Sequence, residues 1–224
     1  MTGRLGLVVL SAAVLTASAV AAPGDREKRD IRPADQALAR KANLRLGDLP
    51  AGFRAKRLSS KADSASEDAG PDSCPGFAPD LSDLVITGEA SSPQFKSTWM
   101  TIHSSAEVYR SIGDERKSWR RTARREAVDC LADAIDKQPA AGMRLTLGAT
   151  LQRPSPRVGE RSVSFRLVGR LTTNGVKIPI WIDLLGVSRG RADATLFVMT
   201  GLKAPSASFE HRLLATLDRR FEPR

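Results

Sequence analysis

Alternating apolar and polar residues in the second half of the chain constrain the fold more than any other feature. Apolar side chains recur at every second position in four successive segments, 143–151, 163–167, 176–184 and 194–198. A period of two is typical of antiparallel strands that turn one face to a hydrophobic core. The pattern therefore predicts four consecutive antiparallel strands.

A turn signal sets the expected register of the second and third of these strands. Asn174-Gly175 is the strongest two-residue signal for a β-hairpin. Centring the turn on these residues makes three pairs agree in character, two apolar and one of opposite charge. The expected pairs are Phe165 with Leu184, Leu167 with Ile182, and Arg166 with Asp183.

The next hairpin fits a three-residue loop over 188–190 with glycine last. This register places Trp181 opposite Phe197, while Val168 lies opposite Trp181 in the preceding hairpin. The outer face of the sheet is then expected to carry Val168, Trp181 and Phe197. Such an apolar face either binds a ligand or is covered, and a helix expected over 206–221 is the natural cover.

The clearest helical pattern covers residues 105–136. Ser104 and Glu107 have the spacing of a capping box, and apolar residues follow at helical spacing as far as Cys130 and beyond. The pattern predicts one long helix, or two helices broken near Gly113. Cys130 is expected on the buried stripe.

The N-terminal segment predicts where the protein acts. Arg4 precedes an apolar run, and small residues offer cleavage after Ala19 or Ala21. This arrangement is typical of a secretory signal peptide, here over 1–22; an uncleaved anchor is the alternative. We therefore expect a secreted, extracytoplasmic protein with no transmembrane domain after cleavage.

The rest of the chain is expected to form a stalk and one domain. Residues 23–43 are charged and nearly free of large apolar side chains, which predicts a flexible stalk with a short helix over 34–41. Residues 44–224 are enough for one domain with a sizeable core. Weaker patterns predict further strands at 53–58, 84–88 and 95–103. The domain is expected to be α+β, with an antiparallel sheet of five to seven strands flanked by a long central helix and a C-terminal helix.

The chain contains two cysteines, Cys74 and Cys130. In an oxidising compartment such a pair most simply forms one disulfide, worth about 4 kcal/mol on the chain-entropy model. A redox pair would need closer spacing. The two histidines, His103 and His211, are isolated, so no metal site is expected.

No motif predicts enzymatic chemistry. Residues 186–190 match the G-x-S-x-G pattern of serine hydrolases, but that motif needs a strand, a sharp turn and a helix. Another strand follows here, so Ser188 is not expected to be a nucleophile. Neither a phosphate-binding loop nor an H-E-x-x-H helix occurs. We expect no catalytic residue and no cofactor, and an unrecognised hydrolase is the third hypothesis.

Charge suggests a different kind of partner. The formal net charge is +10, which attracts anionic lipids, polymers and acidic glycans. Cations gather in one part of the expected helix, at Arg110, Lys117, Arg121, Arg124 and Arg125. They form either a solvated helix face or a docking surface for an anionic envelope component. Nucleic acid is not expected as a partner outside the cytoplasm.

Acidic residues gather in the preceding segment, 61–89, which contains Cys74. Its expected partner, Cys130, follows the basic segment. We therefore expect a disulfide to hold the acidic segment near the basic helix and to neutralise it in part.

Four short motifs add a resemblance. They are D-L-P-x-G-aromatic at 48–53, Cys74-Pro75 in a loop, Cys130-Leu131 at the end of a helix, and an R-G-R turn at 189–191. In this order they resemble actinobacterial-type extracytoplasmic sensor-like domains. That group includes the extracellular domains of PknH-like receptor kinases and the LpqN-type lipoproteins, with a Mog1/PsbP-like fold.

The resemblance implies an α/β/α sandwich, no established enzymatic activity, and a ligand-binding or interaction role. This chain departs from the pattern in two ways, because it can form one disulfide where the kinase domains have two, and because it has no lipobox cysteine. Neither kinase coupling nor a lipid anchor is therefore carried over.

Together these observations predict a secreted, non-enzymatic ligand-binding or sensor-like module of the cell envelope with an unknown envelope ligand or protein as partner. The alternative is a structural or accessory envelope protein that docks on anionic polymers or lipids through the basic helix, 110–125.

Overall fold

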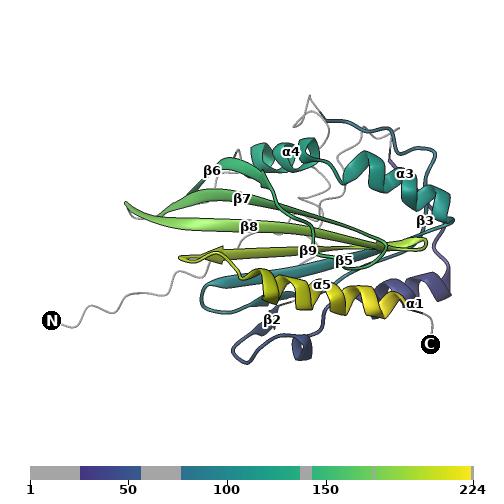
Figure 1. Cartoon of the computed structure of the whole chain (residues 1–224), viewed down its shortest axis with the longest axis horizontal. Helices are drawn as coiled ribbons and strands as arrows, with labels where there is room; N and C mark the ends of the chain where they lie inside the picture. Colours follow the sequence, from purple (N-terminus) through teal and green to yellow (C-terminus); the bar gives the residue numbers. More distant parts are fainter. Residues whose placement is uncertain (1–25, 57–76, 137–142, 174, 223–224) are drawn as a thin grey trace.

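The computed structural model describes residues 26–56, 77–136, 143–173 and 175–222 (Figure 1). The helices are α1 (Pro33–Ala42), α3 (Ile112–Thr122), α4 (Arg125–Asp136) and α5 (Ala207–Phe221). The strands are β1 (Lys28–Arg29), β2 (Arg54–Lys56), β3 (Val85–Ser91), β4 (Gln94–Lys96), β5 (Met100–Tyr109), β6 (Met143–Gln152), β7 (Arg161–Thr173), β8 (Val176–Arg189) and β9 (Ala192–Gly201).

One sheet forms the middle layer. Over the described residues it has nine strands, seven of them in the order β1-β3-β5-β9-β8-β7-β6, with β4 paired to β5 and β2 to β4. Every pairing is antiparallel except that of β1 with β3. Helices α1 and α5 lie on one face, and α3 and α4 lie on the other (Figure 1). The predicted α+β sandwich is confirmed, and its sheet has more strands than expected.

The four alternating segments form β6 to β9, as predicted. All three expected pairs of the first hairpin occur, including Arg166 opposite Asp183. The second hairpin differs, because Arg189 pairs with Ala192 and leaves the two-residue turn Gly190-Arg191. Gly190 has a φ of 61°, a left-handed conformation that glycine adopts at little cost.

This shorter turn changes the two faces of the sheet. Trp181 pairs with Thr200, and Phe197 pairs with Leu184. An odd shift of register moves every side chain of a strand to the other face. Phe197 therefore lies on the α4 face, away from Trp181, and the predicted three-residue loop is wrong.

The expected start of the long helix is also wrong. Residues 105–109 belong to β5, which pairs with β9 from Met100 to Val108. This continuous pairing satisfies the backbone of the whole segment and overrides the local helical signal. The helix begins at Ile112, where the Ser111 hydroxyl accepts a hydrogen bond from the backbone N–H of Asp114 at 3.0 Å. The capping box at Ser104 therefore does not form.

The helical segment divides into two helices, α3 and α4, as one of the two alternatives predicted. The break lies at residues 123–124, ten residues beyond Gly113. At the break the Ala123 backbone N–H bonds to the Trp119 carbonyl and closes the last turn of α3.

The short helix predicted over 34–41 is confirmed as α1, but the prediction that 23–43 is a flexible stalk is wrong from Lys28 onward. β1 pairs in parallel with β3, and α1 packs Ala39 and Ala42 into the core, where both are fully buried. These contacts rest on small side chains, which the search for large apolar residues passes over. The folded domain therefore begins before residue 44.

Helix α1 lies unusually close to β3. A methyl group at Gly88 would overlap the backbone carbonyl of Asp35, so only glycine permits this approach. The Asp35 carboxylate also receives two hydrogen bonds from the Arg191 guanidinium, one of them at 2.8 Å. The R-G-R turn thus ties α1 to the sheet.

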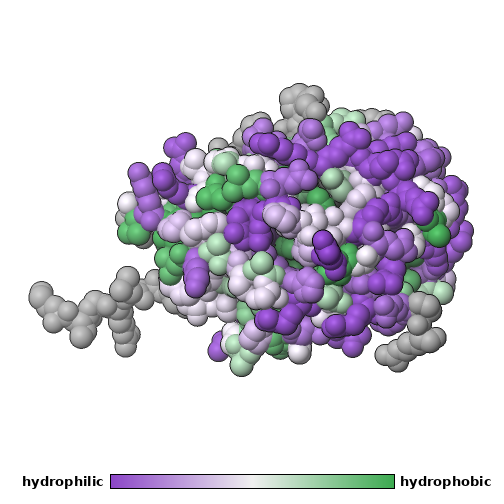
Figure 2. Space-filling model, viewed as in Figure 1, coloured by the Kyte–Doolittle hydropathy of each residue, from purple (hydrophilic) through white to green (hydrophobic). Residues whose placement is uncertain are grey.

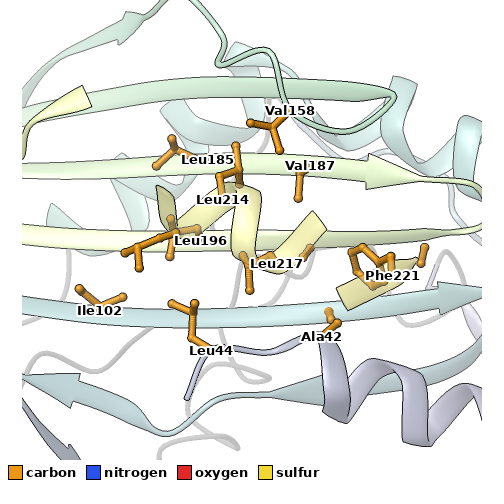
Figure 3. Packing of buried hydrophobic residues seen from close by; sticks show 14 of the residues in the cluster. Ala42, Leu44, Ile102, Val158, Leu185, Val187, Leu196, Leu214, Leu217 and Phe221 are labelled. Carbon is orange, nitrogen blue, oxygen red and sulfur yellow. The ribbon is translucent and has the colours of Figure 1, made fainter. Parts of the chain in front are cut away.

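Apolar residues form one cluster on each face of the sheet. The first lies beneath α1 and α5 and includes Ile102, Leu185, Leu196 and Leu217 (Figure 3). The second lies beneath α4 and includes Phe165, Leu167, Ile182 and Phe197, with Val128 and Leu131 from the helix. Helix α5 carries the expected apolar residues and covers the sheet face that also holds Trp181.

Three predictions lie outside the described residues: the leader over 1–22, Cys74, and most of the loop around it. In the part of the chain that the structure describes, no helix is long and apolar enough to cross a membrane.

Candidate functional site

Four of the five predicted docking cations pair with acidic side chains. The pairs are Arg110 Nη2 to Asp114 Oδ2 at 3.2 Å, Lys117 Nζ to Asp83 Oδ2 at 2.8 Å, Arg121 Nη1 to Asp83 Oδ1, and Arg125 Nε to Asp129 Oδ2 at 3.4 Å. All four cations keep a third or more of their side-chain surface exposed, but their charges are largely balanced by these partners.

The acidic segment before β3 supplies the main counter-charge. Asp83 binds both Lys117 and Arg121, and these cations hold the pKa of its carboxyl well below its usual range. The Asp80 carbonyl accepts a further hydrogen bond from Arg121 at 2.7 Å. The predicted contact between acidic segment and basic helix is confirmed for these residues. The disulfide that was expected to hold it stays a prediction, with Cys130 half-buried on α4.

A second row of cations, on α3 and just beyond its end, is free of ion pairs among the described residues. Arg116 and Arg120 are exposed on α3 at a spacing of four residues, which places them on one side of the helix, and the exposed Arg124 follows the end of α3. Arg124 donates to the Arg120 carbonyl at 2.5 Å. Ile112, four residues before Arg116, lies on the same side of α3 and is 48% exposed. We call Arg116, Arg120 and Arg124 the α3 row.

The predicted ligand face is only partly assembled. Val168 and Trp181 are cross-strand neighbours, both half-buried, on the face that α5 covers. Neither belongs to the apolar cluster beneath that helix. In Figure 1, α5 crosses one half of the sheet and leaves the end near the β7–β8 hairpin without a helix. Phe197 lies on the opposite face and is excluded from this surface.

Cations surround Val168 and Trp181 on the same face. Arg144, Arg170 and Lys177 are all exposed there, because Arg144 and Lys177 both pair with Thr172, two positions beyond Arg170 along β7. Aspartate and glutamate are absent from residues 143–159 and 161–182. We call Arg144, Val168, Arg170, Lys177 and Trp181 the distal patch. Sequence reasoning missed its three cations because it considered charge only on the helix.

A buried charged cluster lies beside the distal patch, beneath the start of α5. The Arg166 guanidinium binds the fully buried Asp183 carboxylate through two bonds of 2.6 and 2.7 Å. Arg153 Nη1 lies 2.8 Å from Glu210 Oε2 and 3.4 Å from Asp183 Oδ1. Burial and the nearby Asp183 raise the pKa of Glu210 to about 7. The Arg166–Asp183 pair was predicted from the register, but its two further partners were not.

Three carboxylates form a second cluster on the face beneath α3. Glu89, Glu107 and Asp193 occupy one cross-strand row on β3, β5 and β9. Burial, with Glu27 and Glu89 nearby, raises the pKa of Glu107 to about 7, although the Tyr109 hydroxyl donates to its Oε2 at 2.6 Å. Burial and Glu107 raise the pKa of Asp193 well above its usual value. We call these three residues the carboxylate row.

The residues considered for catalysis have other partners. Ser188 is fully buried and accepts hydrogen bonds from Arg161 at 2.9 and 3.1 Å. His103 Nδ1 lies 3.4 Å from the Ser92 hydroxyl, but both residues are buried and Ser92 already bonds to the Pro93 carbonyl. His211 is exposed on α5. The geometry thus assembles no nucleophile, base and carboxylate around any of them.

Metal binding gains no support in the described ranges, where no group of three histidine, cysteine, aspartate or glutamate side chains could hold an ion. The three side chains of the carboxylate row likewise do not form such a group. The arrangement of exposed groups is instead suited to contact with a negatively charged surface or polymer.

Comparison with known proteins yields similarity of fold alone. No family model matches the chain, and no curated protein matches it. Among solved structures, the extracellular domain of PknH from Mycobacterium tuberculosis covers 84% of this chain and 97% of its own length, at 7% identity and a TM-score of 0.45. An uncharacterised protein from Mycobacterium smegmatis covers 80% of each chain, at 12% identity and a TM-score of 0.29. Neither likeness carries an argument about ligand or mechanism.

Proposed function

We propose that this protein is a non-enzymatic binding module of the cell envelope, acting outside the cytoplasm, and that it holds an anionic ligand on the distal patch. The observation that carries the proposal is the composition of that patch. Three exposed cations flank a half-buried tryptophan at the end of a sheet face that α5 leaves uncovered, and residues 143–159 and 161–182 contain no aspartate or glutamate. A cationic surface with an aromatic side chain suits a ligand that is both negatively charged and partly apolar.

The second candidate function is docking on an anionic polymer through α3. It is favoured by the α3 row, whose three arginines are exposed and have no ion pair among the described residues. Four of the cations predicted for this role, Arg110, Lys117, Arg121 and Arg125, are weaker candidates, because Asp83, Asp114 and Asp129 already bind them. Arg124, the fifth predicted cation, belongs to the α3 row.

One experiment separates the two candidates. The salt concentration that elutes the protein from immobilised heparin is measured for the unmodified chain and for two double variants, R170S/K177S and R116S/R120S. Each variant loses two exposed cations, so the change in net charge is matched. If the distal patch is the binding surface, R170S/K177S elutes at clearly lower salt and R116S/R120S changes little. The reverse order supports docking through α3, and equal shifts contradict both assignments.

A further inference from the structure

The end of the sheet beyond the distal patch carries unusually exposed apolar side chains. Trp99, Val176 and Leu202 are 54%, 59% and 53% exposed. All three lie at the same end, because β5 and β8 begin there and β9 ends there. In Figure 2 this end, on the left, shows apolar patches between hydrophilic ones, whereas the right end is mostly hydrophilic.

These side chains are arranged around the end of the sheet, not in one groove. The Trp99 ring lies over Gly201, beside Ile178 on the α4 face, and Val176 has the strand parity of Ile178. Leu202 follows β9, and its N–H bonds to the Pro179 carbonyl at 3.1 Å. A small ligand bound on one face could not contact all three residues. A flat surface that lies obliquely across the end of the sheet could, because Val176 lies further out than Trp99 and Leu202.

The β7–β8 hairpin projects beyond its neighbour. Gly201, the last residue of β9, pairs with Ile180, so β8 extends four residues further, to Val176. At about 3.3 Å per residue this is roughly 13 Å of projecting strand. The projection is visible at the left of Figure 1.

The backbone at Leu202 supports a functional role for this end. Leu202 has a φ of 70° and is the non-glycine residue with positive φ among those described. A bulky residue in this conformation is strained, and such strain persists mainly where function requires it. Here it places a large apolar side chain in solvent, next to the exposed Lys203.

We infer that the end of the sheet formed by Trp99, Val176 and Leu202 inserts into the surface of an anionic lipid bilayer. This inference rests on the proposed function and names its ligand. Lys177 lies next to Val176, and Arg170 and Lys203 lie level with or next to Leu202, so lipid headgroups would meet these cations beside the apolar side chains. Tryptophan favours the boundary between headgroups and acyl chains. The absence of acidic residues from 90–106, 161–182 and 194–209 removes repulsion from that surface.

The test is co-sedimentation of the full chain with vesicles of phosphatidylcholine, with and without phosphatidylglycerol. The apolar variant is V176S/L202S and the charge variant is R170S/K177S. The matched control is I31S/I112S, which removes two isoleucines that are 46% and 48% exposed at the opposite end. All forms share the same N-terminal segment, so its own affinity for lipid cancels in the comparison.

Unmodified protein is expected to bind vesicles that contain phosphatidylglycerol more tightly than neutral ones. The apolar variant should bind on the order of tenfold more weakly, and the charge variant about fivefold more weakly for each cation lost. The control should match the unmodified protein. Equal binding by the apolar variant and the control would overturn the inference.

The outcomes also separate this inference from the proposed function. If R170S/K177S loses heparin affinity while the unmodified protein does not bind vesicles, the ligand is an anionic polymer. The proposed function then stands, and only the inference that the ligand is a lipid bilayer is wrong. If the variant changes neither heparin elution nor vesicle binding, the distal patch is not the binding surface and both proposals fail.

Discussion

Replacement of Glu107 by glutamine should stabilise the protein at alkaline pH, an unusual result for a half-buried, hydrogen-bonded side chain. Burial raises the pKa of Glu107 from 4.5 to about 7. Between these values the folded protein keeps a proton that the unfolded chain has released. The contribution of Glu107 to the free energy of unfolding therefore falls as the pH rises from 4.5 to about 7. Above pH 7 this contribution no longer changes with pH.

The magnitude follows from the size of the change in pKa. One pKa unit corresponds to about 1.4 kcal/mol, so the shift of Glu107 corresponds to about 3 kcal/mol at pH 8. Glutamine keeps an oxygen that can accept the hydrogen bond of the Tyr109 hydroxyl, now 2.6 Å from Glu107 Oε2. It loses the extra strength of a bond to a charged acceptor. We expect E107Q to gain about 1–3 kcal/mol at pH 8 and nothing at pH 4.5.

The assay is urea unfolding at pH 4.5, 6, 7 and 8, followed by circular dichroism. The matched control is E89Q, which removes the same charge from the outer end of the carboxylate row. Glu89 is 35% exposed and lies 3.3 Å from Arg29, so its gain should be smaller. If E107Q is no more stable than the unmodified protein at pH 8, or if the difference does not grow between pH 4.5 and 7, desolvation of this carboxylate is not the cause.

Three further predictions concern single contacts. D183N should lose about 3 kcal/mol, because it removes the fully buried carboxylate that the half-buried Arg166 guanidinium binds through two bonds; a thermal unfolding midpoint close to that of the unmodified protein would contradict this. G88A should lose about 3 kcal/mol or more by forcing α1 from the sheet, whereas G47A, which has open space, should change the free energy of unfolding by less than about 0.5 kcal/mol. D83N should cost less than about 1 kcal/mol but raise the salt needed to elute the protein from heparin, because it frees two cations on α3; unchanged elution would refute that reading.

Much of the meander was predictable because its signals are local. Alternation sets which residues share a face, and Asn174-Gly175 sets where the first hairpin turns. The second hairpin was not predictable in the same way, since a glycine at position 190 suits a two-residue turn as well as a three-residue loop. The length of the turn decides the face on which Phe197 lies. That length is set only by the pairing along the whole of β8 and β9.

The candidate site was likewise predictable only in part. Cations on α3 could be recognised from the sequence, but their partners could not, because Asp83 is distant along the chain from Lys117 and Arg121. The cations that are free of ion pairs among the described residues are therefore those of the α3 row. The distal patch was half recognised, through Val168 and Trp181, and its cations became visible only when the strands were placed side by side.

The sequence by itself determined the α+β class, the strands β6 to β9, the first hairpin register and the closing helix, because periodicity and turn chemistry act within a few residues. Tertiary structure alone decided that 100–109 is a strand, that α1 belongs to the core, and which end of the sheet stays open. Those outcomes depend on backbone pairing and packing between segments far apart in the chain, and no local pattern records them.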